Sequence, residues 1–164
     1  MFSKDVVRLS KDILALASNA GVMVATAESC TGGLVAGALT EIAGSSAAVD
    51  RGFVTYSNAA KMQMLGVQEE TLAQFGAVSE QTAREMAAGA VANSGASVSV
   101  AITGIAGPGG GSDDKPVGLV HFGAICLDGT VLHAERRFGD LGREGVREAA
   151  LMQALEMLVQ ALKS

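Results

Sequence analysis

The chain has 164 residues, of which 49% are hydrophobic and only 4% aromatic, and its formal net charge is −5. A chain of this length usually forms one domain and hides roughly two-thirds of its unfolded surface, so we expect a single domain over residues 1–164. The acidic balance argues against binding of duplex DNA, because DNA-binding proteins present a basic face. It does not exclude an anionic small molecule, since a few local arginines suffice for one.

The amino-terminal segment and the apolar runs indicate a soluble protein. Residues 1–12 are charged and carry no apolar signal-peptide core. The most apolar stretch, residues 13–27, is interrupted by polar residues and a glycine, so it is not expected to span a membrane. Cys30 and Cys126 stand far apart, which indicates reduced thiols rather than a disulfide framework. We therefore expect a cytoplasmic protein that binds neither a membrane nor a nucleic acid.

Hydrophobic periodicity predicts alternating helices and strands along the chain. In the first helix, Val6, Leu9 and Ile13 recur at steps of three and four and form one apolar stripe. Helices are expected at 3–20, 32–42, 58–65, 69–75, 79–95 and 143–163, and strands at 22–27, 53–56, 97–103, 117–127 and 130–138. Residues 104–116 contain five glycines and two prolines, so they are expected to form a loop.

The order of these segments predicts the fold class. Helices that alternate with short buried strands form the layers of an α/β domain. Asp128 and Gly129 separate the last two strands and favour a two-residue hairpin turn. We therefore expect a three-layer α/β/α sandwich with a mixed sheet that ends in a β-hairpin.

Residues 26–33, TAESCTGG, lie where a predicted strand meets a predicted helix. The first backbone N–H groups of a helix lack intrahelical partners, and the helix dipole adds partial positive charge there. Such amides could bind an anion or stabilise an oxyanion, with Ser29 as the attacking hydroxyl. The candidate amides are those of Cys30, Thr31, Gly32 and Gly33. Alternatively, Ser29 or Thr31 only caps the helix while the glycines allow close packing, and the spacing alone leaves both interpretations open.

Residues 56–61, YSNAAK, hold the single tyrosine of the chain, Tyr56, and a lysine, Lys61, that stands among alanines and methionines. A lysine buried among such residues loses solvation, its pKa falls, and the neutral amine can act as a general base toward a serine. An exposed lysine on the helix surface is the alternative. Ser57 stands four residues before Lys61 and is therefore a second candidate nucleophile beside Ser29.

Two further segments are candidates for ligand binding. Gly104 and Gly107 follow a predicted strand, at the strand end where ligands sit in sheets of this class, and they lack side chains that would block approach. A mobile connector is the alternative for this segment. Arg143 and Arg147 stand one turn apart at the start of the last helix and could clamp a phosphate between them. The alternative is that both face solvent and pair with neighbouring glutamates.

The sequence predicts neither a metal nor a cofactor. His121 and His133 are its two histidines, and no Cys or His cluster has ligand spacing. With the hairpin turn at residues 128–129, His121 is expected to lie opposite residue 136 rather than His133. The neighbouring acids at 113–114 could hold a divalent ion, but acids on a glycine-rich loop are usually only solvated.

Four blocks of the sequence resemble those of the CinA carboxy-terminal domain family. They are TAESCTGGLVAGALTEIAGSS, GFVTYSNAAKMQMLGV, GAVSEQTAREMA and AITGIAGPGGGSDDKPVGLV, and the resemblance covers nearly the whole chain. Members are described as nicotinamide-nucleotide amidohydrolases, which hydrolyse the carboxamide of nicotinamide mononucleotide to nicotinate mononucleotide and ammonia. The resemblance therefore implies a carbon–nitrogen hydrolase of pyridine nucleotide salvage.

The resemblance also implies roles for single residues. The family's serine nucleophile matches Ser29, the tyrosine and lysine of its YSN-x-x-K block match Tyr56 and Lys61, and the threonine of its TGIAGP block matches Thr103. Lys61 would be the base, and Tyr56 and Thr103 are expected to orient it or relay its proton. The family commonly reads G-D-R after the last strand, whereas FGDLGREGVRE here inserts a leucine and a glycine before Arg143.

Two other functions fit the same glycine-rich segments. A non-catalytic nucleotide-binding or interaction domain linked to competence or DNA damage would not need a lysine of low pKa. A phosphohydrolase acting on a related nucleotide would release phosphate instead of ammonia. The sequence leaves the oligomeric state open, with a homo-oligomer among the outcomes.

Overall fold

A five-stranded mixed sheet lies at the centre of the computed structural model, which describes residues 1–164. The strands are β1 (Val24–Glu28), β2 (Val49–Val54), β3 (Val98–Gly104), β4 (Leu119–Ile125) and β5 (Val131–Arg137), and their order in the sheet is β2-β1-β3-β4-β5. β1 pairs in parallel with β2 and β3, whereas β4 pairs antiparallel with β3 and β5. The predicted mixed sheet that ends in a hairpin is therefore confirmed.

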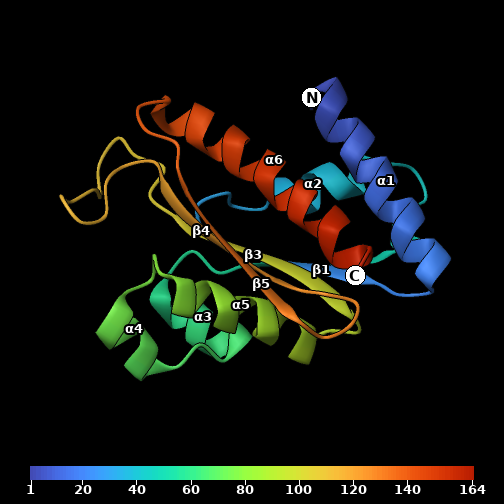
Figure 1. Ribbon diagram of the computed structural model, residues 1–164, viewed down its shortest axis with the longest axis horizontal. Helices are drawn as coiled ribbons and strands as arrows, with labels where there is room; N and C mark the ends of the chain where they lie inside the picture. The colour runs from blue at the N-terminus through green and yellow to red at the C-terminus, as the bar shows by residue number, and fades with distance from the viewer.

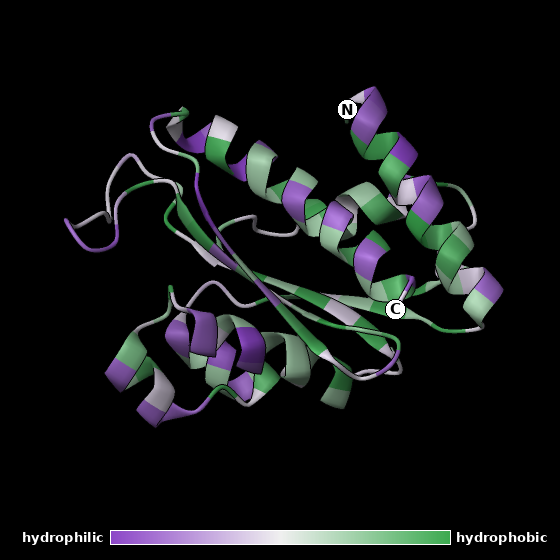
Figure 2. Cartoon of the chain, in the orientation of Figure 1, coloured by the Kyte–Doolittle hydropathy of each residue, from purple (hydrophilic) through white to green (hydrophobic).

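Helices cover both faces of this sheet (Figure 1). One layer consists of α1 (Lys4–Ala20), α2 (Leu34–Thr40) and α6 (Gly142–Leu162), and the other of α3 (Asn58–Leu65), α4 (Glu69–Phe75) and α5 (Glu80–Ala92). The first layer and the sheet enclose a hydrophobic cluster of 28 buried residues, and the second encloses one of 10. Figure 2 shows apolar residues along the central strands and alternating colours along the helices, as expected for helices with one buried face. The predicted three-layer α/β/α sandwich is confirmed.

Local signals in the sequence determine where the helices begin and end. Ser3 Oγ accepts the Val6 N–H at 3.3 Å and begins α1, and Gly21 ends it in the left-handed region at φ 67°. Ser79 begins α5 in the same manner, by accepting the Thr82 N–H at 3.2 Å. No helix of the structure is both long and apolar enough to cross a membrane.

Two elements near the candidate site differ from the predicted ranges. α2 begins at Leu34 rather than residue 32, because Gly32 and Gly33 adopt positive φ angles of 59° and 101° and form a turn. β2 begins at Val49 rather than residue 53, and a short 3₁₀ helix, η1 (Ser45–Ala47), precedes it. β2 is an edge strand with several exposed residues, so its sequence lacks the apolar pattern of a buried strand.

The hairpin between β4 and β5 has a longer turn than the sequence predicted. Ile125 pairs with Val131, and the Cys126 N–H donates to the Thr130 carbonyl at 2.8 Å. Gly129 takes a φ of 86° but Asp128 has no positive φ, which fits a three-residue loop with a bulge and not a two-residue type I′ turn, where both central residues need a positive φ. The two-residue turn was therefore a wrong prediction, and the register of β5 shifts by one residue.

This shift in register brings the two histidines together. His121 lies opposite Glu135 instead of residue 136, and its Nδ1 is 3.0 Å from His133 Nε2. Residue 136 was therefore the wrong partner for His121, and His133 is not directly opposite it either, but the two histidines are diagonal neighbours on one face of the hairpin.

Candidate active site

The candidate site lies at the carboxyl ends of β1 and β3, where the turn after β1 meets the glycine-rich loop after β3. In a sheet with parallel strands, both of these ends open at the same edge. A cavity of about 250 Å³ lies between the two segments. Its lining residues are Ser29, Cys30, Tyr56, Gly104, Ile105, Ala106, Gly107, Gly109, Gly110 and Arg143.

Ser29 and Lys61 are in direct contact at this cavity. Lys61 Nζ lies 3.0 Å from Ser29 Oγ and donates to the Thr55 carbonyl at 2.9 Å. Ser29 stays in register with the sheet, since its N–H donates to the Ile102 carbonyl at 2.9 Å. The predicted contact between the serine and the lysine is therefore present in the structure.

The lysine is buried rather than exposed. Lys61 retains only 1% of its accessible surface, and burial lowers the pKa of its amine from the ordinary value of 10.5. No carboxylate forms an ion pair with this amine, and loss of solvation outweighs the opposing effect of the neighbouring Cys30. A lysine in this setting can lose its proton and accept one from a neighbouring hydroxyl.

The rival serine has a structural partner of its own. Ser57 Oγ accepts the Ala60 N–H at 3.1 Å and forms the amino-terminal cap of α3. Its side chain is exposed and does not line the cavity with Ser29. The geometry therefore favours Ser29 over Ser57 as the nucleophile.

Tyr56 and Thr103 do not hold Lys61, contrary to the expectation from the sequence. Tyr56 is 60% exposed, and its hydroxyl accepts an N–H of Arg143 at 2.9 Å. Thr103 is buried and donates to the Ala77 carbonyl at 2.7 Å, which ties β3 to the segment before α5. The Thr55 carbonyl orients the lysine instead, and a main-chain acceptor of this kind leaves no signal in the sequence.

The backbone amides of the turn divide into two groups. The N–H groups of Val35 and Ala36, at the start of α2, donate to the carboxylate of Glu28 at 2.9 and 3.1 Å. The Gly32 N–H donates to the Ser29 carbonyl at 3.0 Å, whereas the N–H groups of Cys30, Thr31 and Gly33 donate to no acceptor within the chain. The helix start is therefore already occupied by a carboxylate, and the free donors lie in the turn beside Ser29. Glu28 was not among the predicted site residues, although the sequence places an acid directly before this turn.

Two glycines predicted to admit a ligand are required by packing. A Cβ on Gly104 would lie 2.7 Å from Val120 Cγ2, and a Cβ on Gly107 would lie 2.6 Å from Val117 Cγ1. Gly107 also has a φ of 84°, which disfavours other residues. Gly104 allows close packing of β3 on β4, and Gly107 allows the loop to fold back on itself, while the backbone of both lines the cavity.

The two arginines at the start of α6 occupy different places. Arg143 lines the cavity and donates to the Gly107 carbonyl and the Tyr56 hydroxyl, both at 2.9 Å. Arg147 donates to the carbonyls of Cys30 and Thr31 at 3.1 and 3.3 Å. The predicted clamp of two arginines on one phosphate does not form, because Arg147 is held behind the turn.

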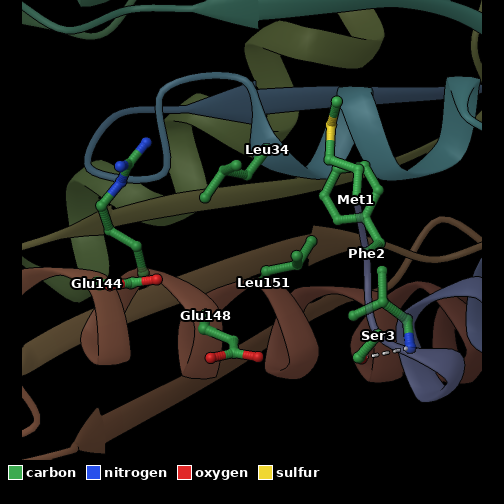
Figure 3. Close-up of a pocket in the computed structure, with 9 residues that line it drawn as sticks. Met1, Phe2, Ser3, Leu34, Glu144, Glu148 and Leu151 are labelled. Atoms are coloured by element: carbon green, nitrogen blue, oxygen red, sulfur yellow. Dashed lines mark hydrogen bonds between the residues drawn. The ribbon is translucent and has the colours of Figure 1, made fainter.

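Arg147 also lines a separate cavity of about 330 Å³ on the far side of the turn. Figure 3 shows Leu151 of α6 pointing toward Leu34 of α2 and the amino-terminal Phe2, with Glu144 and Glu148 on the same helix. The cavity is larger than the one at Ser29 but contains neither the serine nor the lysine. We therefore take the smaller cavity as the candidate active site.

The burial of Cys30 bears on its chemistry. Burial raises the pKa of the Cys30 thiol to about 11, so the thiol is protonated at neutral pH. No group of three or more His, Cys, Asp or Glu side chains is gathered where it could hold a metal ion.

A serine hydroxyl beside a buried lysine, next to free backbone amides, is an arrangement suited to hydrolysis of an amide or ester. The comparison with known proteins agrees with this class. The chain belongs to the CinA C-terminal domain family, whose model matches residues 6–162.

The relatives of the chain include named enzymes. It is 54% identical over 160 residues to the nicotinamide-nucleotide amidohydrolase PncC of Enterobacter agglomerans, covering 98% of this chain and 94% of the relative. It is 50% identical over 161 residues to the PncC protein of Escherichia coli K12, covering 98% and 96%. A solved structure of the competence/damage inducible protein CihA from Agrobacterium tumefaciens has 60% identity and a TM-score of 0.96, and covers 100% of this chain and 99% of that one.

Proposed function

We propose that this protein hydrolyses the carboxamide of nicotinamide mononucleotide to nicotinate mononucleotide and ammonia, with Ser29 as the nucleophile and Lys61 as its base. The observation that carries the roles of these residues is the 3.0 Å contact between Lys61 Nζ and Ser29 Oγ at a buried lysine. The substrate follows from the relatives, which are named nicotinamide-nucleotide amidohydrolases at 54% and 50% identity.

In the first half of the reaction, the neutral amine of Lys61 accepts the proton of the Ser29 hydroxyl. Ser29 Oγ then forms a bond to the carboxamide carbon, and the carbonyl oxygen becomes an oxyanion. The free N–H groups of Cys30 and Thr31 are the donors available to it. Protonated Lys61 returns its proton to the leaving nitrogen, the C–N bond breaks, and ammonia leaves an acyl-enzyme.

In the second half, water takes the place that ammonia left. Lys61 accepts a proton from the water, whose oxygen attacks the acyl carbon. The bond to Ser29 Oγ breaks, and the serine regains its proton from Lys61. The carboxylic acid that forms gives its proton to solvent, and nicotinate mononucleotide leaves as a carboxylate. The amine takes and returns one proton in each half, so the cycle needs no metal or cofactor.

Arg143 is the residue suited to the substrate phosphate. Its two hydrogen-bond acceptors, the Gly107 carbonyl and the Tyr56 hydroxyl, are both uncharged, and no carboxylate pairs with it. A guanidinium without a counterion at the edge of a cavity binds a phosphate by charge-assisted hydrogen bonds. Arg147 is not assigned to the phosphate in this proposal.

An assay of ammonia release tests the proposal. Purified protein is incubated with nicotinamide mononucleotide, with and without a chelator, and ammonia and nicotinate mononucleotide are quantified together. Equal amounts of both products are expected, with no effect of the chelator and no turnover by Ser29→Ala. Release of phosphate without ammonia would instead identify a phosphohydrolase. Binding of the nucleotide with no product at all would identify a non-catalytic binding domain.

A further inference from the structure

Glu28 is a buried carboxylate that the reaction described above does not use. It is the last residue of β1 and directly precedes Ser29, and its exposed fraction is 0%. One carboxylate oxygen accepts the Val35 N–H at 2.9 Å, and the other accepts the Ala36 N–H at 3.1 Å. Thr26 Oγ1 also donates to this second oxygen, at 3.3 Å. A buried charge is costly, so this arrangement calls for an explanation.

The two N–H groups belong to the start of α2, where helix amides have no intrahelical partners. The side chain of Glu28 therefore reaches past the turn at 29–33 and holds the beginning of the helix from inside the fold. A negative charge is favourable at this end of a helix. The positive end of α2 is thus compensated by the chain itself and is not left for the substrate.

Arg147 holds the same turn from the opposite side. Its guanidinium donates to the carbonyls of Cys30 and Thr31 at 3.1 and 3.3 Å. In a trans peptide the carbonyl and the following N–H point in opposite directions. A Cys30 carbonyl directed at Arg147 therefore turns the Thr31 N–H away from it, and this N–H is one of the turn amides left without an acceptor.

The backbone of Glu28 is also connected to the lysine. Its carbonyl accepts the Thr55 N–H at 2.9 Å, and the Thr55 carbonyl accepts the Lys61 amine at 2.9 Å. Glu28 thus contacts the start of α2 through its side chain, and through its main chain it contacts Thr55, which holds the Lys61 amine. A shift at this residue would move both members of the Ser29–Lys61 pair.

We propose that Glu28 is a positioning residue, which keeps Ser29 Oγ and the free amides of Cys30 and Thr31 in the geometry required for attack. This inference rests on the proposed function, because it assumes that Ser29 is the nucleophile. The size of the expected effect is large, since a misplacement of about 1 Å costs roughly 100-fold in rate.

The first test is the kinetics of Glu28→Gln. The amide keeps the shape of the side chain, but its NH₂ group faces an N–H donor and leaves one helix amide unpaired. We expect kcat for ammonia release to fall about 100-fold while KM changes less than about threefold. A rise in KM with kcat unchanged would overturn the proposal, because it would place the start of α2 in substrate binding.

A matched control is available at α4. Glu85 also accepts a backbone N–H at the start of a helix, that of Gln68 at 2.9 Å, and a hydroxyl, that of Thr71. Neither Glu85 nor its partners line the cavity. Glu85 is only partly buried, so we expect Glu85→Gln to lower Tm less than Glu28→Gln does, while kcat stays within about threefold of the original. An equal loss of kcat in both variants would reduce Glu28 to a purely structural role.

The second test does not depend on the substrate. Phenylmethanesulfonyl fluoride modifies an activated serine by forming a bond between Oγ and sulfur and releasing fluoride, while the hydroxyl proton goes to the base. We expect the rate of Ser29 modification, followed by mass spectrometry, to fall in Glu28→Gln in parallel with kcat. If the original protein releases no ammonia from nicotinamide mononucleotide, the proposed function fails, yet this labelling rate still tests Glu28.

A milder variant covers the case in which Glu28→Gln does not fold. Thr26→Val keeps the shape of the side chain and removes one of the three hydrogen bonds to the carboxylate. We expect the labelling rate of Ser29 to fall about three- to tenfold, in line with the loss of one long hydrogen bond of ordinary strength. A labelling rate equal to that of the original protein would overturn the proposal.

Discussion

Lys61 Nζ lies 3.0 Å from Ser29 Oγ, although the two residues are 32 positions apart in the chain. Two strands and two helix starts bring them together: Ser29 follows β1, and Lys61 stands on α3 directly after β2. Because β1 and β2 are parallel neighbours, the segments that follow them begin at the same edge of the sheet. The contact is therefore a consequence of the topology, and it places a buried amine on the only serine that lines the cavity.

Loss of either member of this pair should abolish turnover. Ser29→Ala removes the nucleophile and is expected to lower kcat by about three or more orders of magnitude. Lys61→Met removes the base, keeps a side chain of similar length, and no longer buries an amine. We expect a similar loss of kcat with a Tm close to that of the original protein. The double variant should lose no more than either single variant, because the two residues act as one unit; additive losses would contradict this.

Cys30 should contribute through its backbone and not through its thiol. Burial raises the pKa of this thiol to about 11, so a thiolate nucleophile is not available at neutral pH. Cys30→Ala retains the backbone N–H and should keep kcat within about tenfold of the original. Treatment with iodoacetamide at pH 7 is a second check and should leave activity intact. An inactive Cys30→Ala with an active Ser29→Ala would identify a thiol enzyme.

The features that could be predicted from the sequence are those with local causes. The ends of α1 follow from Ser3 and Gly21, and its buried face follows from apolar residues at helical spacing. The hairpin was anticipated, but its register depended on whether Gly129 belonged to a two- or a three-residue loop. A glycine with a positive φ suits both loops, so the residue type at 129 does not determine the choice.

The parts of the site that the sequence missed depend on contacts between distant or main-chain groups. Arg147 stands 117 positions from Cys30, whose carbonyl it holds, so its proximity to Arg143 in the sequence was misleading. Lys61 is oriented by the carbonyl of Thr55, and every residue has a carbonyl. Glu28 compensates α2 from inside the fold, whereas sequence rules place such acids in the first turn of the helix itself.

Substitution of the two arginines should change different kinetic parameters. Arg143→Ala removes the guanidinium at the cavity, which has no counterion. Loss of its charge-assisted hydrogen bond to the phosphate should weaken the free energy of substrate binding by about 1.5–3 kcal/mol. We expect this loss as a raised KM with kcat little changed. Arg147→Ala frees the carbonyls of Cys30 and Thr31, so it should lower kcat more than it raises KM. Each variant is the control for the other, and equal effects of both on KM would restore the predicted phosphate clamp.

The histidine pair of the hairpin should make stability depend on pH. Burial lowers the pKa of His121 and of His133 below the ordinary 6.5. The two histidines therefore bind protons at a higher pH in the unfolded chain than in the folded one. Their contribution to the free energy of unfolding is fully present above about pH 6.5, and it is lost as the pH falls through their lower pKa values in the folded protein. Tm measured from pH 7.5 to 5 should decline, and His121→Gln should flatten this decline. An unchanged slope in His121→Gln would show that other groups cause it.

The rate of the reaction should rise with pH as Lys61 loses its proton. Only the neutral amine can accept the proton of Ser29, and burial lowers the pKa of this amine from 10.5. In a profile of kcat/KM against pH, the ascending limb should therefore lie clearly below 10.5. Tyr56→Phe is the control, since the Tyr56 hydroxyl bonds to Arg143 and not to Lys61. This variant should keep the position of the ascending limb and change KM, because it removes only the hydrogen bond between the Tyr56 hydroxyl and Arg143. A limb that lies near 10.5, or that moves in Tyr56→Phe, would show that the buried lysine is not the base.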